Sequence, residues 1–450
     1  MLQKNEIIIL TAEGYTSEGA AVCRAEGYVV FVPGMLRGER ARVQLLKVKK
    51  TYAYGKITEL LETSPHRREP DCASYPKCGG CQLRHMSYRE ELDFKRQLVQ
   101  DALQRIGGLE VTVHPVTPSP LREHYRNKAQ LPVRQAKGNP EVGFYAARSH
   151  RLIPFDSCLI QDDRTNKAAD ALLRYMKETG AEAYDETTHK GLIRHLYLRF
   201  GSDGRQVMVC VVINGTGLPQ PELLCRLMRE AVGEGVTVVQ NSNRDHTNVV
   251  LGKETVSLLG DGCIYDTLCG LEFVISPHAF FQVNHRQTQQ LYQKALELAD
   301  LTGSETVLDL YCGIGTITLL FAQHAKLAYG VEVVPQAVEN ARENARRNGL
   351  SHVSFFCEDA ARAAERFEQI KIDVVTLDPP RSGCGTQLID AVCKISPHRI
   401  VYISCNPATL SRDLKDFSQA GYQTKEAFPF DMFPGTAHVE CVVLMSRVDN

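Results

Sequence analysis

From about residue 291 onward, the sequence alternates between short apolar strands and helical segments. This alternation constrains the fold most strongly, because it predicts a doubly wound parallel sheet with helices on both faces. In such a sheet the carboxyl ends of the strands meet at one edge, where ligands bind. The residues that follow each strand are therefore the first candidates for a functional site. The predicted strands cover residues 306–310, 327–331, 353–357, 373–377 and 400–404.

The rest of the chain predicts two further domains. At 450 residues the chain exceeds what one hydrophobic core usually supports, so a multidomain α/β protein is expected. Residues 1–62 carry short strands separated by glycines, which is typical of a small OB-type barrel. Such a barrel either binds RNA or only packs on its neighbour. Residues 63–290 are expected to form a mixed α/β domain, and residues 291–450 the sheet described above.

A helical pattern runs over residues 87–106. Ser87 is the predicted N-cap, and Glu90, three residues later, completes a capping box. We expect this helix either to remain with the central domain or to pack on the C-terminal one.

A local cluster of basic residues is a candidate RNA-binding surface. The formal net charge is −1, so affinity for a nucleic acid depends on local cations and not on the overall field. Residues 36–56 contain seven cations and only one acidic residue, Glu39. The alternative interpretation is a solvated loop rim without a binding role. The cations are Arg37, Arg40, Arg42, Lys47, Lys49, Lys50 and Lys56.

The cysteine content and the hydropathy pattern indicate a reducing compartment. No apolar segment reaches the length of a membrane span, and the first apolar run is too short for a signal peptide. The chain has 15 cysteines, an odd number. We therefore expect reduced thiols in the cytoplasm, some with metal or catalytic roles, and no membrane partner.

The first predicted strand of the C-terminal sheet leads into a turn that contains Gly313 and Gly315. A dinucleotide-binding turn would have a third glycine where this chain has Thr318, so a nicotinamide cofactor is disfavoured. Glu332 ends the next strand, where a carboxylate can accept both ribose hydroxyls. The combination predicts an adenosyl ligand without a pyrophosphate. Asp359 is a weaker candidate for contact with the adenine.

Two further strand ends carry candidates for the chemistry. Asp378 is followed by two prolines, which fix the backbone outside the strand, and Cys405 follows the last predicted strand. A thiolate that adds to C6 of uracil would make C5 nucleophilic, and a base would later remove the C5 proton. Glu440 is the candidate base, with His438 nearby. Cytosine methyltransferases often have a cysteine where this chain has Arg381, so uracil is preferred.

Together these motifs resemble those of the bacterial RNA uracil-5-methyltransferase family, especially the branch that modifies 23S ribosomal RNA. The resemblance implies a TRAM barrel, a central domain and a Rossmann-like class I methyltransferase domain in a monomer. It assigns Gln282, Tyr311, Glu332 and Asp378 to S-adenosylmethionine, with Cys405 as nucleophile and Glu440 as base. The motifs are FFQVN at 280–284, DLYCGIGT at 309–316, LDPPR at 377–381, SCNP at 404–407 and DMFPGTAHVE at 431–440.

The ribosomal branch of this family also carries an iron-sulfur cluster. Cys72, Cys78 and Cys81 in one loop, together with the distant Cys158, have the same arrangement. Three thiolates in one loop and one remote ligand suit a [4Fe-4S] cluster better than zinc, which tends to use two close pairs. A structural zinc site is the alternative.

Three other functions are alternatives to the methylation of ribosomal RNA. The chain has the motifs of a transfer-RNA uracil-5-methyltransferase as well. A catalytically inert RNA-binding iron-sulfur protein would have lost Cys405, Glu440 or Asp378, and all three are present. A nicotinamide dehydrogenase is disfavoured by Thr318 and would leave Cys405 without a role.

Overall fold

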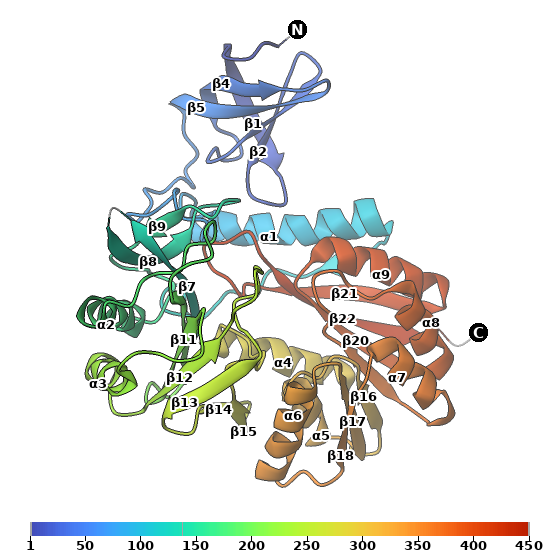
Figure 1. Ribbon diagram of the computed structural model, residues 1–450. Helices are drawn as coiled ribbons and strands as arrows, with labels where there is room; N and C mark the ends of the chain where they lie inside the picture. The colour runs from blue at the N-terminus through green and yellow to red at the C-terminus, as the bar shows by residue number, and fades with distance from the viewer. Residues whose placement is uncertain (1, 137, 449–450) are drawn as a thin grey trace.

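The computed structural model describes residues 2–136 and 138–448, and it is built around three large sheets and one two-stranded sheet (Figure 1). The first is a closed barrel in the order β1-β2-β3-β5-β4, which confirms the small N-terminal barrel. Alternate residues of its strands point inward, as the period of a half-buried strand requires. The strands are β1 (Ile7–Tyr15), β2 (Ala21–Ala25), β3 (Tyr28–Val32), β4 (Arg40–Val48) and β5 (Tyr52–Glu62).

The central domain has a seven-stranded sheet in the order β13-β12-β11-β10-β7-β8-β9 and a separate hairpin, β14-β15. Helices α2 (Arg164–Thr179) and α3 (Pro221–Val232) pack on one face of this sheet. The strands are β7 (Lys128–Ala136), β8 (Asn139–Tyr145), β9 (Leu152–Pro154), β10 (Ile193–Phe200), β11 (Val207–Ile213), β12 (Val236–Ser242), β13 (Glu254–Leu259), β14 (Ile264–Leu268) and β15 (Leu271–Ile275).

The C-terminal sheet has eight strands in the order β18-β17-β16-β19-β20-β22-β21-β6. The five strands expected from the alternation are present and parallel, which confirms the methyltransferase-like fold. Antiparallel β22 and β21, and the short β6, extend the sheet beyond them. The strands are β6 (Thr112–Val113), β16 (Thr306–Asp309), β17 (Leu327–Glu332), β18 (Val353–Cys357), β19 (Val374–Leu377), β20 (Arg399–Ser404), β21 (Tyr422–Phe430) and β22 (Glu440–Arg447).

Helices cover both faces of the C-terminal sheet, and one face shares its core with the central domain. The cores under the two faces contain different helices, α4 to α6 in one and α7 to α9 in the other. Apolar residues of β10, β11 and β12 join the first of these cores. The helices are α4 (His285–Ala299), α5 (Thr316–Ala322), α6 (Pro335–Arg347), α7 (Ala360–Arg366), α8 (Thr386–Ile395) and α9 (Pro407–Gln419). Among the described residues, the helices are all too short or too polar to cross a membrane.

Helix α1 (Tyr88–Ala102), continued by a π-helical turn to Gly107, lies between the barrel and the C-terminal domain (Figure 1). Its apolar residues Val99 and Leu103 belong to a core of the C-terminal sheet. Ser87 caps the helix by accepting a hydrogen bond from the amide of Glu90 at 3.3 Å. The Glu90 side chain does not complete the capping box, however. It accepts a hydrogen bond from Tyr15 of the barrel at 2.7 Å instead.

A buried lysine joins α1 to the segment before β22. The Lys95 ammonium donates hydrogen bonds to Glu91 at 2.7 Å and to Asp431 at 2.6 Å, and its side chain is fully buried. Burial alone would lower the pKa of Lys95, but the two carboxylates raise it above its usual value. A third hydrogen bond reaches the carbonyl of Phe433 at 3.2 Å.

Removal of the Lys95 cation should be costly, because two carboxyl groups would lose their buried partner. We expect Lys95→Met to destabilise the contact between α1 and residues 431–435 by about 3 kcal/mol or more. The measurement is hydrogen exchange of peptides from these two segments. Arg105→Ala is the control, since Arg105 pairs with Asp101 at an exposed site, where a salt bridge contributes at most about 1 kcal/mol. Similar exchange in the two variants would contradict the prediction.

Candidate active site

A cavity of about 270 Å³ lies at the carboxyl edge of the C-terminal sheet. Tyr311, Glu332 and Asp359 line it together, and they follow or end the neighbouring strands β16, β17 and β18. Three residues that the sequence placed at an adenosyl ligand are therefore in one site. Gln282 and Asp378, which the family resemblance also assigned to this ligand, are not among the lining residues.

The turn after β16 explains the two glycines. Both have positive φ, +54° at Gly313 and +87° at Gly315, a conformation that other residues seldom adopt. A Cβ atom at Gly315 would also lie 3.2 Å from the ring of Phe355. Glu332 fixes the turn by accepting a hydrogen bond from the amide of Gly313 at 3.2 Å. The other carboxylate oxygen accepts from Val334 at 2.9 Å, and both oxygens retain lone pairs for ligand hydroxyls.

Asp309, a residue without a role predicted from the sequence, is a central residue of this edge. It ends β16 with no exposed surface and accepts a hydrogen bond from the Thr318 hydroxyl at 2.6 Å. Burial raises its pKa to about 6. The threonine in place of a third glycine is therefore the partner of a buried carboxylate. An acidic residue at a strand end directly before the glycine turn was the available signal.

Cys405 and Glu440 are brought together by the pairing of β20 with β22. Ser404 pairs with Cys441 in the antiparallel register, so the next residues outward are Cys405 and Glu440. Cys405 precedes α9, whose N-cap is Asn406. The proposed nucleophile and base therefore face each other at the carboxyl end of β20, although the sequence predicted only one of the two strands.

Three acidic groups at this edge, those of Cys405, Glu440 and Asp378, have raised pKa values. Burial raises the pKa of the Cys405 thiol to about 11, and the negative charges of Glu440 and Asp378 add to the shift. Burial, followed by the charge of Asp378, raises the pKa of Glu440 to about 8. Burial raises the pKa of Asp378 to about 7. Shifts of this kind, clustered in one place, are typical of sites that move protons.

Arg381 supplies the opposing positive charge. It lowers the pKa of both Cys405 and Glu440, against the effect of burial. Its carbonyl accepts a hydrogen bond from the Asn406 side chain at 3.0 Å, which ties the loop after β19 to the start of α9. From the sequence, Arg381 is predicted only to exclude a cytosine enzyme. Its position, three residues after Asp378, was the signal for a cation at this site.

His438 lies near Arg381, whereas Gln282 lies in the segment before α4. Burial, and then the charges of Arg381, Lys95 and Arg126, lower the pKa of His438 to about 4, so its imidazole is neutral at pH 7. Gln282 is buried in the segment before α4, and its backbone carbonyl accepts a hydrogen bond from Asn127 at 3.0 Å.

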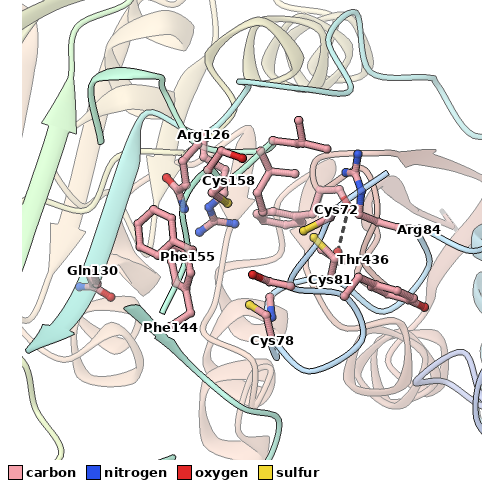
Figure 2. A pocket seen from close by; sticks show the side chains of 18 of the residues that line it. Cys72, Cys78, Cys81, Arg84, Arg126, Gln130, Phe144, Phe155, Cys158 and Thr436 are labelled. Carbon is pink, nitrogen blue, oxygen red and sulfur yellow. Dashed lines mark hydrogen bonds between the residues drawn. The ribbon is translucent and has the colours of Figure 1, made fainter. Parts of the chain in front are cut away.

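The four cysteines of the predicted cluster line one cavity of about 370 Å³ between the central and C-terminal domains. Figure 2 shows Cys72, Cys78 and Cys81 in one loop, with Cys158 approaching from another segment. Burial raises the pKa of Cys81 to about 12, and the other three thiols contribute to the shift. His438 and Arg381 line the same cavity, which therefore adjoins the Cys405 centre.

The chemistry of this cavity fits an anionic group with thiolate ligands. The amide of Gly80 donates to the Cys78 sulfur at 3.4 Å, and Arg84 and Lys128 are among the lining cations. The buried Nε of Arg126, another lining residue, has no hydrogen-bond partner among the described residues. Over residues 2–136 and 138–448, however, no three His, Cys, Asp or Glu side chains form a group that could hold a metal ion.

The chain is similar to known RNA methyltransferases. A family model described as tRNA (Uracil-5-)-methyltransferase matches residues 270–448, and a TRAM domain model matches residues 3–58. An uncharacterized RNA methyltransferase from Halalkalibacterium halodurans is 43% identical over 447 residues, which is 99% of this chain and 98% of that protein. One from Clostridium tetani is 44% identical over 447 residues, covering 99% of this chain and 97% of that protein.

A solved structure extends the similarity over nearly the whole chain. The tRNA (uracil-54, C5)-methyltransferase of Pyrococcus abyssi, in complex with S-adenosyl-L-homocysteine, superposes with a TM-score of 0.76 and 26% identity. The match covers 97% of this chain and 100% of the Pyrococcus chain. The chain therefore belongs to the S-adenosylmethionine-dependent RNA uracil-5-methyltransferase family, with an N-terminal TRAM domain.

Proposed function

We propose that this protein methylates C5 of a specific uridine in 23S ribosomal RNA through a covalent adduct on Cys405. The observation that carries the proposal is that Cys405 and Glu440 directly adjoin the paired residues Ser404 and Cys441, at the same sheet edge as the cavity lined by Tyr311 and Glu332. The four-cysteine arrangement supports the ribosomal substrate, because it resembles that branch of the family. The Pyrococcus neighbour, named as a transfer-RNA enzyme, supports the alternative substrate. The proposal places a monomer in the cytoplasm, where its free thiols would stay reduced.

The residues of the sheet edge suggest how the methyl donor would bind. S-adenosylmethionine, when bound, would supply an electrophilic methyl group. Glu332 would accept the ribose hydroxyls, while Tyr311 and Asp359 would border the adenosine in the 270 Å³ cavity. We assign Gln282 and Asp378 to the same ligand, beyond the present limits of that cavity.

The chemistry of uracil assigns a step to each of the two catalytic residues. The Cys405 thiol loses its proton to solvent, an ionisation that Arg381 favours, and its sulfur forms a bond to C6. The electron pair of the C5=C6 bond would move toward O4, and C5 would then take the methyl group from the sulfonium of the bound donor, whose S–CH3 bond breaks to leave a neutral thioether. The Glu440 carboxylate removes the C5 proton, which re-forms the double bond and expels the Cys405 thiolate.

The raised pKa of Glu440 suits this role. A carboxylate whose conjugate acid has a pKa of about 8 is a stronger base than one in water. Glu440 can accept the C5 proton only when its own carboxyl is ionised. Only the molecules with an ionised Glu440 can therefore complete the reaction. Arg381, by lowering the pKa of Glu440, increases that fraction near neutral pH.

We further propose that Cys72, Cys78, Cys81 and Cys158 hold a [4Fe-4S] cluster. In a four-iron cluster each cysteine binds a different iron, so the thiols surround the group and do not converge on one point. The observation that supports this proposal is that the four thiols line one cavity. The lining cations Arg84, Arg126 and Lys128 suit a negatively charged cluster. Its role would be structural, because the proposed methylation involves no net electron transfer.

The substrate can be tested in a strain that lacks the gene. We expect 5-methyluridine to disappear at one or more positions of 23S ribosomal RNA and to remain in transfer RNA. The measurement is mass spectrometry of nuclease-digested RNA. Complementation with the unmutated gene should restore the modification, whereas a gene encoding Cys405→Ala should not. Loss from transfer RNA alone would favour the alternative substrate.

The covalent step can be tested with Glu440→Gln. This variant keeps the nucleophile but cannot remove the C5 proton, so methylated RNA should remain attached to the protein. We expect a shifted protein–RNA band on a denaturing gel with labelled RNA and S-adenosylmethionine, and turnover at least about 100-fold slower. The band should be absent when Cys405 is also replaced by Ala. A band that survives this replacement would identify a different nucleophile, and normal turnover without an adduct would exclude Glu440 as the base.

The cluster can be tested by purification without oxygen. We expect brown protein with iron and inorganic sulfide near four equivalents each, because the proposed cluster contains four of each. Cys158→Ala should lower the iron content, whereas Cys225→Ala, a replacement outside the cavity, should leave it unchanged. Colourless protein with stoichiometric zinc would contradict the proposal.

A further inference from the structure

Three aromatic rings form a cluster on the outer surface of the barrel. The ring centroids of Phe31 and Tyr54 are 5.7 Å apart, those of Tyr52 and Tyr54 are 5.7 Å apart, and those of Phe31 and Tyr52 are 6.1 Å apart. Tyr52 and Tyr54 are 36% and 40% exposed. We call Phe31, Tyr52 and Tyr54 the aromatic platform. Large apolar rings that remain exposed in a group indicate a binding surface more often than isolated ones do.

Strand pairing explains why the platform faces solvent. In β5, Ala53 is fully buried in the barrel, and so Tyr52 and Tyr54 on either side of it point outward. Phe31 of β3 pairs directly with Tyr54 of β5 and contributes its ring from the neighbouring strand. Lys56 continues the outward row of β5 beyond the two tyrosines. The barrel core does not use these rings, because they lie on its outer face.

Lysines border the platform on the side of β4. Lys47 pairs with Tyr54 across the β4-β5 ladder, and the amide of Lys49 donates to the carbonyl of Tyr52 at 2.8 Å. Within residues 2–136 and 138–448, neither lysine forms a salt bridge, and Lys50 and Lys56 form none either. All four are exposed.

The arginines of the same sequence region are different. Arg40 lies 3.3 Å from Glu62, and Arg42 lies 3.0 Å from Glu59. The acid Glu39 is fully buried and pairs with Arg67. The cationic surface available to an anion is therefore concentrated in the lysines next to the platform, and not spread over residues 36–56.

We infer that the aromatic platform binds unpaired nucleotides of the RNA substrate. Exposed rings beside a row of cations suit single-stranded RNA, since bases stack on the rings and phosphates contact the lysines. A duplex cannot use the rings, because its bases are stacked on one another. The inference rests on the proposed function in one respect, namely that the substrate is RNA. It adds that the barrel recognises a single-stranded segment.

Replacement of the rings and replacement of the lysines should change RNA affinity and its salt dependence in different ways. Tyr52→Ala combined with Tyr54→Ala should weaken binding of a short oligouridine about tenfold or more, without changing the dependence of affinity on salt. Lys47→Ala combined with Lys50→Ala should weaken binding and flatten the salt dependence. Tyr52→Phe combined with Tyr54→Phe keeps the rings and should bind within about twofold of the unmutated protein. Thermal unfolding of each variant tests whether the barrel is intact.

The absence of tryptophan from this chain provides a second, direct measurement. Tyr54→Trp introduces a single indole into the platform, and oligouridine that stacks on it should quench its fluorescence. A duplex with the same number of phosphates should quench it much less. The control is Val256→Trp, on the exposed edge strand β13 of the central domain, where the original side chain is 54% exposed.

The outcomes separate this inference from the proposed function. Unchanged oligouridine affinity in the Tyr→Ala variant, or equal quenching of the two indoles, would overturn the platform even if the protein methylates uridine. Equal quenching by duplex would also overturn it, since the rings would not distinguish unpaired bases. Conversely, reduced binding with selective quenching would support the platform even if Cys405 and Glu440 failed to form the expected adduct.

Discussion

The arrangement of the candidate active site depends on the ion pairs that the buried Lys95 ammonium forms. An isolated charge with no exposed surface would be strongly unfavourable, and Glu91 and Asp431 compensate for it at 2.7 and 2.6 Å. Both carboxylates are themselves held by other groups. Tyr88 donates to Asp431 at 2.9 Å, and the amide of Gly435 donates to Glu91 at 2.7 Å. Because every member has several partners, the network fixes one position of α1 against the C-terminal domain.

This network contacts the segment that joins the cysteine loop to the proposed base. The carbonyl of Gly435 accepts hydrogen bonds from the amides of Gln82 and Leu83 at 3.0 and 2.9 Å, directly after Cys81 of the cysteine loop. In the other direction, the same segment leads within a few residues to Glu440 at the start of β22. The cysteine loop and the proposed base are therefore positioned by one short segment. A structural cluster in this cavity would add to the same effect, because it would fix the loop that contacts Gly435.

The sequence predicted the parts of the fold that follow from local periodicity. The five parallel strands, the glycine turn and the place of Cys405 after β20 all depend on patterns of a few residues. The contacts that complete the site depend on residues far apart in the chain. Lys95 and Asp431 are 336 residues apart, and a lysine in an amphipathic helix is ordinarily expected in solvent. Likewise, the role of Thr318 became evident only from its contact with Asp309, and Glu90 contacts the barrel instead of capping its own helix.

The position of Glu440 at the end of an antiparallel strand has a chemical consequence. Because β22 pairs with β20 in the interior of the sheet, its first residue is excluded from water beside Cys405. Burial raises the pKa of both Cys405 and Glu440. The same cause therefore makes the Glu440 carboxylate a stronger base and keeps more of the carboxyl protonated before the reaction. A carboxyl on an exposed loop would ionise more readily but would be a weaker base for a carbon acid. The charge of Arg381 partly offsets the effect of burial. It lowers the pKa of Glu440 and so favours ionisation of the carboxyl, while the surrounding sheet still excludes water.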